Sequence, residues 1–177
     1  KPVLLSQRAV LDHVDNYAKS IKLTEDDKIV SWLPLYHDMG LIAAFHLPLS
    51  FGITSIQVDP FEWVLAPSLL FEALAAEKGT VTWLPNFAYS FMADRIEEDE
   101  MENVSLESLR LVINCSEPVR NESHKKFTAA FEKYGFNSLA LSASYAMAET
   151  TFAATQKTPG QPIVKIEVTG KALLKER

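Results

Sequence analysis

Cysteine is nearly absent from this chain of 177 residues, which contains Cys115 alone. A single thiol cannot form an internal disulfide, so we expect a reducing and therefore cytoplasmic compartment. Cys115 stands in an apolar run, where a cysteine is far more often a small buried side chain than a nucleophile. The thiol is therefore not expected to carry chemistry.

Positive charge is also scarce, because 17 Lys and Arg face 23 Asp and Glu and leave a net charge of −6. Nucleic-acid binding usually needs a clustered basic face, so we expect no nucleic-acid partner. The longest apolar stretch, 39–51, is interrupted by His46, Pro48 and Ser50 and is shorter than the ~20 residues of a membrane span. We therefore expect no membrane span.

Metal-binding patterns are missing as well. The four histidines include no pair with the spacing of a metal site, and the acidic run 97–100 is typical of a solvated loop or helix end. The chain has no internal repeat and no low-complexity tract. We expect one domain, or part of one.

What the sequence does contain is a regular alternation of helical and strand patterns. In 7–21, for example, Val10, Val14, Tyr17 and Ile21 recur at the spacing of one helix face. Helices are predicted over 7–21, 39–50, 67–77, 86–96 and 121–134. Strands are predicted over 29–33, 53–58, 80–84, 109–115 and 138–142, with short β structure at 164–168. The alternation predicts an α/β fold with a mainly parallel sheet.

Three segments that follow strands are candidates for a functional site. They are 33–40, 114–120 and 142–151. In open α/β sheets, ligands bind beyond the carboxyl ends of the strands. Because parallel strands share one carboxyl edge, we expect the three segments to converge there, and this convergence is a stronger argument than any one segment.

Each segment has two interpretations on residue types alone. Tyr145, Glu149 and two hydroxyls could stack a base, hold Mg²⁺ and donate to a phosphate, or Glu149 could begin a helix while Tyr145 packs in the core. The segment 114–120 could close a nucleotide pocket or be a turn before the next helix. His37 could meet a substrate carboxylate or phosphate, or be a hydrogen-bonded structural residue.

Together the segments resemble the adenylate-forming superfamily of acyl-CoA synthetases, firefly luciferase and nonribosomal-peptide adenylation domains. The match lies in Trp-Leu-Pro-Leu-Tyr-His-Asp-Met-Gly-Leu-Ile (32–42), Ser-Glu-Pro-Val-Arg (116–120) and Tyr-Ala-Met-Ala-Glu (145–149). Within this superfamily, the residues of these motifs most resemble those of the fatty acyl-AMP ligases. The first motif is long and specific, and the resemblance extends from residue 1 to about 157.

The resemblance implies ATP and Mg²⁺ as cofactors, with Glu149 as the metal ligand and Tyr145 stacked on adenine. It places His37 near the acyl carboxylate and the α-phosphate, with Met39, Gly40 and Leu41 toward an acyl tunnel. The residues that it assigns to the nucleotide site are Ser116, Glu117, Pro118, Ser144, Tyr145, Ala146, Met147, Ala148 and Thr150. Glu149 and His37 are the implied catalytic residues.

The implied reaction joins a fatty or other carboxylic acid to AMP and releases pyrophosphate. A thiol of an acyl carrier protein or of coenzyme A then accepts the acyl group. Positioning and charge stabilisation would dominate such catalysis. The sequence does not separate an acyl-AMP ligase from an acyl-CoA ligase.

The chain departs from the family pattern at Ala146, where glycine is usual, and at Ala148, which has no hydroxyl to offer a phosphate. The phosphate loop, the ribose-binding aspartate and the C-terminal domain with its lysine are not in the sequence, although Lys1 could be the last lysine of that loop. We therefore expect 1–177 to be a single segment of the N-terminal AMP-binding domain, inactive alone.

Two other functions compete with this interpretation. His37-Asp38 could belong to a metal-dependent HD phosphohydrolase, but that family needs further ligands on an all-helical bundle. The chain could instead come from a degenerate, non-catalytic domain that binds a nucleotide or acyl chain, which Ala146 favours and the retention of Tyr145 and Glu149 disfavours.

Overall fold

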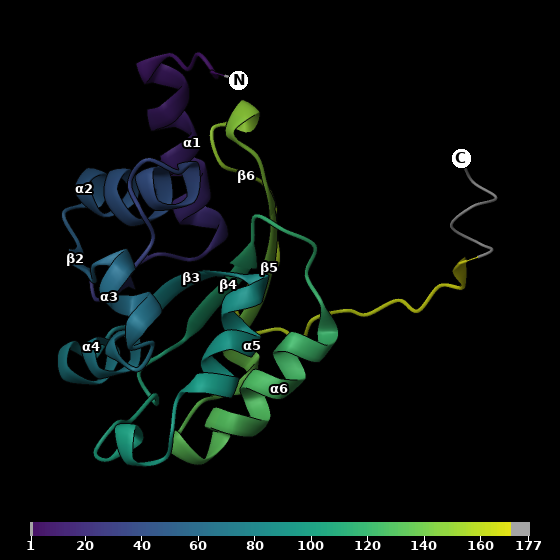
Figure 1. The fold of residues 1–177 in the computed structure, drawn as a ribbon. Coiled ribbons are helices and arrows are strands. Elements are labelled where there is room, and N and C mark those ends of the chain that lie inside the picture. Colours follow the sequence, from purple (N-terminus) through teal and green to yellow (C-terminus); the bar gives the residue numbers. More distant parts are fainter. Residues whose placement is uncertain (1, 171–177) are drawn as a thin grey trace.

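The computed structural model describes residues 2–170, so Lys1 lies outside the described residues (Figure 1). Helices are α1 Gln7–Ser20, the π-helix η1 Met39–His46, α2 Leu47–Phe51, α3 Pro60–Leu65, α4 Leu69–Glu77, α5 Asn86–Arg95 and α6 Asn121–Phe131. Strands are β1 Lys28–Ser31, β2 Thr54–Gln57, β3 Val81–Pro85, β4 Leu111–Cys115, β5 Leu141–Ala146 and β6 Ala153–Gln156. The predicted α/β alternation is confirmed.

The strands form one sheet in the order β2-β1-β3-β4-β5-β6. Every neighbouring pair from β2 to β5 is parallel, and only β6 runs antiparallel, against β5. The register pairs Trp83 with Ile113 and Asn114 with Ala143 at the centre. A mainly parallel sheet was predicted, and it is confirmed.

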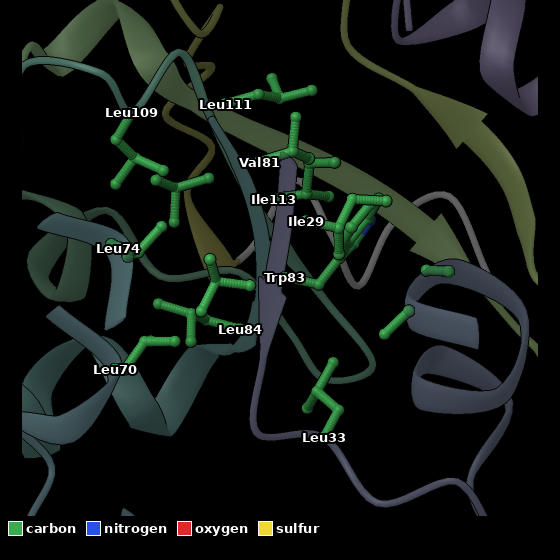
Figure 2. Packing of buried hydrophobic residues seen from close by; sticks show 14 of the residues in the cluster. Ile29, Leu33, Leu70, Leu74, Val81, Trp83, Leu84, Leu109, Leu111 and Ile113 are labelled. Carbon is green, nitrogen blue, oxygen red and sulfur yellow. The ribbon is translucent and has the colours of Figure 1, made fainter. Parts of the chain in front are cut away.

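Helices cover both faces of the sheet (Figure 1). On one face, the indole N–H of Trp83 in β3 donates to the hydroxyl of Tyr17 in α1, at 2.8 Å. On the other face, Leu84 points toward Leu70 and Leu74 of α4 (Figure 2). Neighbouring residues of β3 thus point to opposite faces, as the pleat of a strand requires. Strands buried on both faces explain the continuous apolar runs in the sequence.

The core is continuous across the sheet, and its centre contains Ile29, Val81, Trp83, Leu111 and Ile113, all fully buried (Figure 2). Near the carboxyl end of β1, the rings of Trp32 and Trp63 stack with centroids 3.6 Å apart. Phe127 joins this core from α6, beside α5.

Several element predictions were wrong in extent or kind. The strand predicted at 138–142 is displaced, because 138–140 forms a 3₁₀ turn and β5 extends to Ala146. Ser144 and Tyr145 therefore lie inside the strand, not after it. The β structure predicted at 164–168 is absent, since this described segment leads away from the sheet (Figure 1). The helix predicted at 39–50 begins as a π-helix, and α3 and β6 were not predicted.

The remaining short turns are 3₁₀ elements: η2 Asp99–Met101, η3 Glu132–Tyr134, η4 Ser138–Ala140 and η5 Ala148–Thr150. Within residues 2–170, no helix is both long enough and apolar enough to cross a membrane.

Candidate active site

The three candidate segments meet at one edge of the sheet. Strands β1, β3, β4 and β5 are adjacent and parallel, so their carboxyl ends lie along the same edge. The segment 33–40 follows β1. Of the segment 114–120, residues 114–115 end β4 and 116–120 follow it, and of the segment 142–151, residues 142–146 belong to β5 and 147–151 follow it. The fold thus provides the convergence that the sequence predicts.

The segment after β1 folds into a tight turn around Gly40. The His37 N–H donates to the carbonyl of Pro34 at 3.2 Å. A Cβ at Gly40 would lie 2.4 Å from the Pro34 carbonyl oxygen and 2.9 Å from that of Leu33. Because both neighbours are backbone atoms, only glycine fits here without moving the turn.

His37 projects from this turn with 53% of its side chain exposed. Its Nδ1 lies 2.7 Å from Asp38 Oδ1, and it accepts from the Met39 N–H at 3.3 Å. Asp38 also caps η1 through the Met39 N–H. The imidazole is therefore both hydrogen-bonded locally and accessible, and the two interpretations of His37 are compatible. Leu41, in η1, is partly exposed beside the buried Gly40 and Met39.

Met39 joins the first segment to the second. Its sulfur lies 2.9 Å from Cys115 Sγ and 3.4 Å from Ser116 Oγ. Cys115 is fully buried, as predicted, and this burial raises the pKa of its thiol to about 12. A thiol that stays protonated at neutral pH is a poor nucleophile.

The part of the second segment that follows β4 begins with a residue of positive φ, Ser116, and is hydrogen-bonded to α5. Ser116 has φ of +75°, a left-handed conformation that is uncommon outside glycine. The carboxylate of Glu117 accepts from the Phe87 N–H at 2.6 Å, which places it on the amino end of α5. Ser116, Glu117 and Pro118 are all exposed.

The third segment is held by the antiparallel strand β6. Ser144 Oγ donates to the carbonyl of Thr155 at 2.7 Å, and the Tyr145 N–H donates to Thr155 Oγ1 at 3.3 Å. Tyr145 is 61% exposed, so the alternative that it packs in the core is wrong. Ala146 does not have positive φ, so the usual glycine is not needed for backbone conformation here.

Beyond β5 the chain turns sharply through η5. Met147 and Ala148 are half-buried, whereas Glu149 and Thr150 are exposed. Glu149 lies in a single 3₁₀ turn, so it does not begin a longer helix. Thr150 Oγ1 donates to the carbonyls of Met147 and Phe152, both at 3.0 Å, and Thr151 has φ of +72°. Ser116 in the second segment and Thr151 in the third segment thus both have positive φ, a conformation that also occurs at Lys22, Lys78 and Asn103.

A pocket of about 480 Å³ lies between the second and third segments. Its lining consists of Ser116, Glu117, Pro118, Val119, Ala143, Ser144, Tyr145, Ala146 and Thr155. Of the predicted nucleotide-site residues, Met147, Ala148 and Thr150 are outside this lining, as are Glu149 and His37. The pocket has the size of ordinary small-molecule sites, and Tyr145 offers it an aromatic ring.

A buried polar network behind the second segment was not predicted. Asn114 Nδ2 lies 3.1 Å from Asn86 Oδ1 and 2.8 Å from His124 Nε2. Burial, followed by the charge of Lys165, lowers the pKa of His124 to about 4. Asn114, near the carboxyl end of the predicted strand 109–115, was the one available signal, because a buried amide requires partners.

The pocket lies at the carboxyl edge of a mainly parallel sheet and is bordered by the ring of Tyr145 and the exposed side chain of Glu117. These features define the class: an α/β protein with a candidate small-molecule site. A sequence model described as "AMP-binding enzyme" matches residues 1–176. The chain therefore belongs to the AMP-binding enzyme family.

The relatives of this chain that have curated names include ligases of fatty acids. The chain is 30% identical over 177 residues to "Medium-chain-fatty-acid--[acyl-carrier-protein] ligase JamA" of Moorena producens, covering 100% of this chain and 30% of that protein. It is 32% identical over 167 residues to "Probable long-chain-fatty-acid--AMP ligase FadD30" of Mycobacterium tuberculosis, and the match covers 90% of this chain and 28% of that protein. The chain thus spans under a third of the length of these relatives.

A solved structure, the fatty acid AMP ligase from Legionella pneumophila, superposes with a TM-score of 0.89 at 35% identity. The superposition covers 90% of this chain and 28% of that chain. The α/β fold described above is therefore the fold of the matching part of an adenylate-forming enzyme.

Proposed function

We propose that this chain is part of an ATP-dependent enzyme that activates a fatty or other carboxylic acid as its acyl-adenylate. The observation that carries the proposal is the pocket between 116–119 and 143–146, bordered by Tyr145 and next to the turn that bears Glu149. The Legionella pneumophila ligase has also been solved in complex with acyl adenylate and pyrophosphate, at the same TM-score of 0.89 and 35% identity. We propose that 1–177 is one segment of the N-terminal AMP-binding domain.

In this proposal, the pocket holds the adenosine part of ATP. The exposed ring of Tyr145 stacks on adenine, and the backbone of Ser116, Glu117 and Pro118 lines the base. Ser144, Ala146, Met147, Ala148 and Thr150 complete the nucleotide side. Thr150 Oγ1 has one proton, which is already directed to the carbonyls of Met147 and Phe152, so it offers no further proton to a phosphate.

Glu149 is the proposed Mg²⁺ ligand. Among residues 2–170 there is no cluster of three or more His, Cys, Asp or Glu side chains that could hold a metal. An exposed single carboxylate still fits Mg²⁺, which proteins often bind through one or two carboxylates together with substrate phosphates and water. Bound there, the ion would neutralise charge on the phosphates.

The reacting acid is proposed to lie on the side of Met39, near His37. One carboxylate oxygen bonds to the α-phosphorus of ATP, and the bond from that phosphorus to the β,γ-phosphate breaks, which releases pyrophosphate. The accessible imidazole of His37 would orient the acid and the α-phosphate, while Gly40 and Leu41 border the acyl chain. The contribution of the protein is positioning and charge stabilisation.

The acyl-adenylate then needs an acceptor thiol, either on a carrier-protein phosphopantetheine arm or on coenzyme A. The thiol bonds to the acyl carbon and AMP leaves. The name of the Moorena producens relative specifies an acyl-carrier protein, whereas other relatives are named as CoA ligases. A cytoplasmic location and the absence of a nucleic-acid partner stay predictions.

A non-catalytic binding domain is the second candidate, and Ala146 was its main support. Because Ala146 does not adopt positive φ, its replacement of glycine does not impair this backbone. The catalytic proposal is therefore favoured.

The decisive experiment is acid-dependent ATP–pyrophosphate exchange by the complete enzyme, with short, medium and long fatty acids and with residues 1–177 alone as the control. Exchange by the complete enzyme and none by the segment is the expected result, and the preferred acid gives the chain length. A folded enzyme without exchange for any acid would support the non-catalytic candidate.

A further inference from the structure

The loop 116–120 is fastened at two points to the first two residues of α5. The Phe87 N–H donates to the Glu117 carboxylate at 2.6 Å, and the Arg120 N–H donates to Asn86 Oδ1 at 2.9 Å. The residues between these points, 116–119, are one wall of the 480 Å³ pocket. The start of α5 thus determines where that wall lies.

Asn86 is itself fixed from two other elements. Only 5% of it is exposed, and Asn86 Oδ1 also accepts from Asn114 Nδ2 in β4 at 3.1 Å. Asn86 Nδ2 donates to Ser123 Oγ in α6 at 3.2 Å. The amide therefore cannot rotate without leaving buried polar groups unpaired, which is costly.

Asn114 extends the network away from the pocket. It is fully buried, and its Nδ2 lies 2.8 Å from His124 Nε2. With its two hydrogens given to Asn86 and His124, Asn114 Nδ2 is fully used. This assignment requires a neutral imidazole with its proton on Nδ1, in keeping with a pKa lowered by burial.

The loop needs such support because its first residue is strained. Ser116 has φ of +75°. A non-glycine residue persists in this conformation only where surrounding structure over-determines it. The hydrogen bonds at Glu117 and Arg120 supply that constraint on the carboxyl side of Ser116.

We propose that Asn86 is a positioning residue for the nucleotide pocket, acting through the backbone of Arg120 to hold the wall 116–119 opposite Tyr145. Asn86 touches no ligand in this account. The inference rests on the proposed function for its kinetic consequence, whereas the fastening of the loop by Asn86 can be measured without any activity.

The kinetic test compares Asn86→Ala with Ser123→Ala in the complete enzyme. Asn86→Ala removes the acceptor for the Arg120 N–H, while Ser123→Ala cuts the same network on the side away from the loop. We expect Asn86→Ala to raise KM for ATP about tenfold, in proportion to one lost hydrogen bond, with KM for the fatty acid within about twofold. Ser123→Ala should leave KM for ATP within about twofold.

Asn86→Asp is the conservative variant. A carboxylate at residue 86 still accepts from Arg120 and Asn114, and the Ser123 hydroxyl can turn to donate to it. Its charge lies at the amino end of a ten-residue helix, where it is favoured. We expect Asn86→Asp to restore KM for ATP to within about threefold of the wild type. If Asn86→Ala does not fold, Asn86→Ser, too short to reach Arg120, takes its place.

Hydrogen–deuterium exchange of the peptide containing Arg120 provides the second measurement. Asn86→Ala should speed exchange of that amide at least tenfold, and Ser123→Ala should not. Unchanged exchange in Asn86→Ala, or equal KM changes in Asn86→Ala and Ser123→Ala, would overturn the inference. A wild-type enzyme without acid-dependent exchange of pyrophosphate would instead overturn the proposed function, and amide exchange would still decide the role of Asn86.

Discussion

At the amino edge of the sheet, polar groups are buried and fully paired. The Asp27 carboxylate, 3% exposed, receives two hydrogen bonds from Arg110, at 2.7 and 2.5 Å. Thr80 Oγ1 and the Thr24 N–H also donate to it, at 2.6 and 2.8 Å. One carboxylate thus joins the residues that precede β1, β3 and β4.

At the carboxyl edge, the groups of the candidate site are exposed to solvent. Tyr145 and Glu149 are exposed, and both Ser116 and Thr151 have positive φ. The comparison teaches that the two edges of the sheet have different roles. Hydrogen bonds at the amino edge hold the strands together, whereas the carboxyl edge keeps polar groups accessible to a ligand. Changes at the amino edge should therefore alter stability, and changes at the carboxyl edge should alter activity.

The largest expected effect is on stability at the amino edge. Arg110→Met leaves the buried Asp27 carboxylate without its partner, which should lower the free energy of unfolding by about 3–5 kcal/mol. The control is Lys126→Met, which removes an exposed ion pair with Asp94 and should cost at most about 1 kcal/mol. Urea denaturation measures both, and equal losses would contradict the comparison.

The largest expected effect on activity is at Glu149. Glu149→Gln should lower Mg²⁺-dependent adenylation by the complete enzyme about 10²–10³-fold, because a charge that stabilises the reacting phosphates is lost. Its free energy of unfolding should change by no more than about 0.5 kcal/mol, as for other exposed positions. Glu122→Gln, at an exposed residue of α6, is the matched control. Wild-type activity in Glu149→Gln would remove Glu149 from the site.

A smaller effect is expected at the turn that carries His37. Gly40→Ala brings a Cβ to 2.4 Å from the Pro34 carbonyl oxygen, and the backbone must shift to relieve this contact. We expect a loss of about 1–3 kcal/mol of stability together with a higher KM for the fatty acid. Gly170→Ala, with nothing within 4 Å of the added Cβ, should have no effect. Thermal unfolding and exchange kinetics of both variants test this.

Counted per pH unit, the smallest expected change is in the pH dependence of stability, and the two edges should differ in the pH range of this change. Burial lowers the pKa of His124 from 6.5 to about 4, so its contribution is complete above pH 6.5 and is lost as the pH falls toward 4. The slope should approach about 1.4 kcal/mol per pH unit and vanish in His124→Gln.

At Asp27, burial alone would raise the pKa, but hydrogen bonds from Arg110, Thr80 and Thr24 and the charge of Arg110 outweigh it and lower the pKa. Its contribution is complete above the ordinary pKa of 3.8 and is lost as the pH falls through the lowered value. Asp27→Asn should therefore change the slope only below about pH 4. Urea denaturation from pH 3 to 8 measures both ranges, and a flat profile between pH 4 and 6.5 would contradict the account of His124.

Much of the fold could be predicted because its signals are local. Apolar strands ended by Pro34 and Pro85, and helices with one apolar face, gave the alternation and hence the parallel sheet. Helix α3 was missed, although Asp59 and Pro60 form a recognisable start, with the Asp59 carboxylate accepting from Phe61 and Glu62.

Strand β6 could not be predicted, because Ala-Ala-Thr-Gln has little β-propensity and owes its conformation to pairing with β5. The reverse error occurred at 164–168, where a strand-like pattern finds no neighbouring strand. A strand-like pattern of residues therefore forms a strand only where a neighbouring strand is available for pairing.

The candidate site divides in the same way. Its segments could be located because they follow strands, and parallel strands place them together. The contribution of Asn86 and Asn114 could not be inferred, since it depends on side chains 28 residues apart meeting beneath the loop. The conformation of Ser116 also depends on those contacts.

The most direct test of the two-edge account is hydrogen–deuterium exchange of the complete enzyme with and without MgATP. The account predicts protection of the peptides that contain 116–120 and 144–151, and unchanged exchange around Asp27, Thr80 and Arg110. Protection confined to the amino edge, or no protection at 116–120 and 144–151 under saturating MgATP, would contradict it.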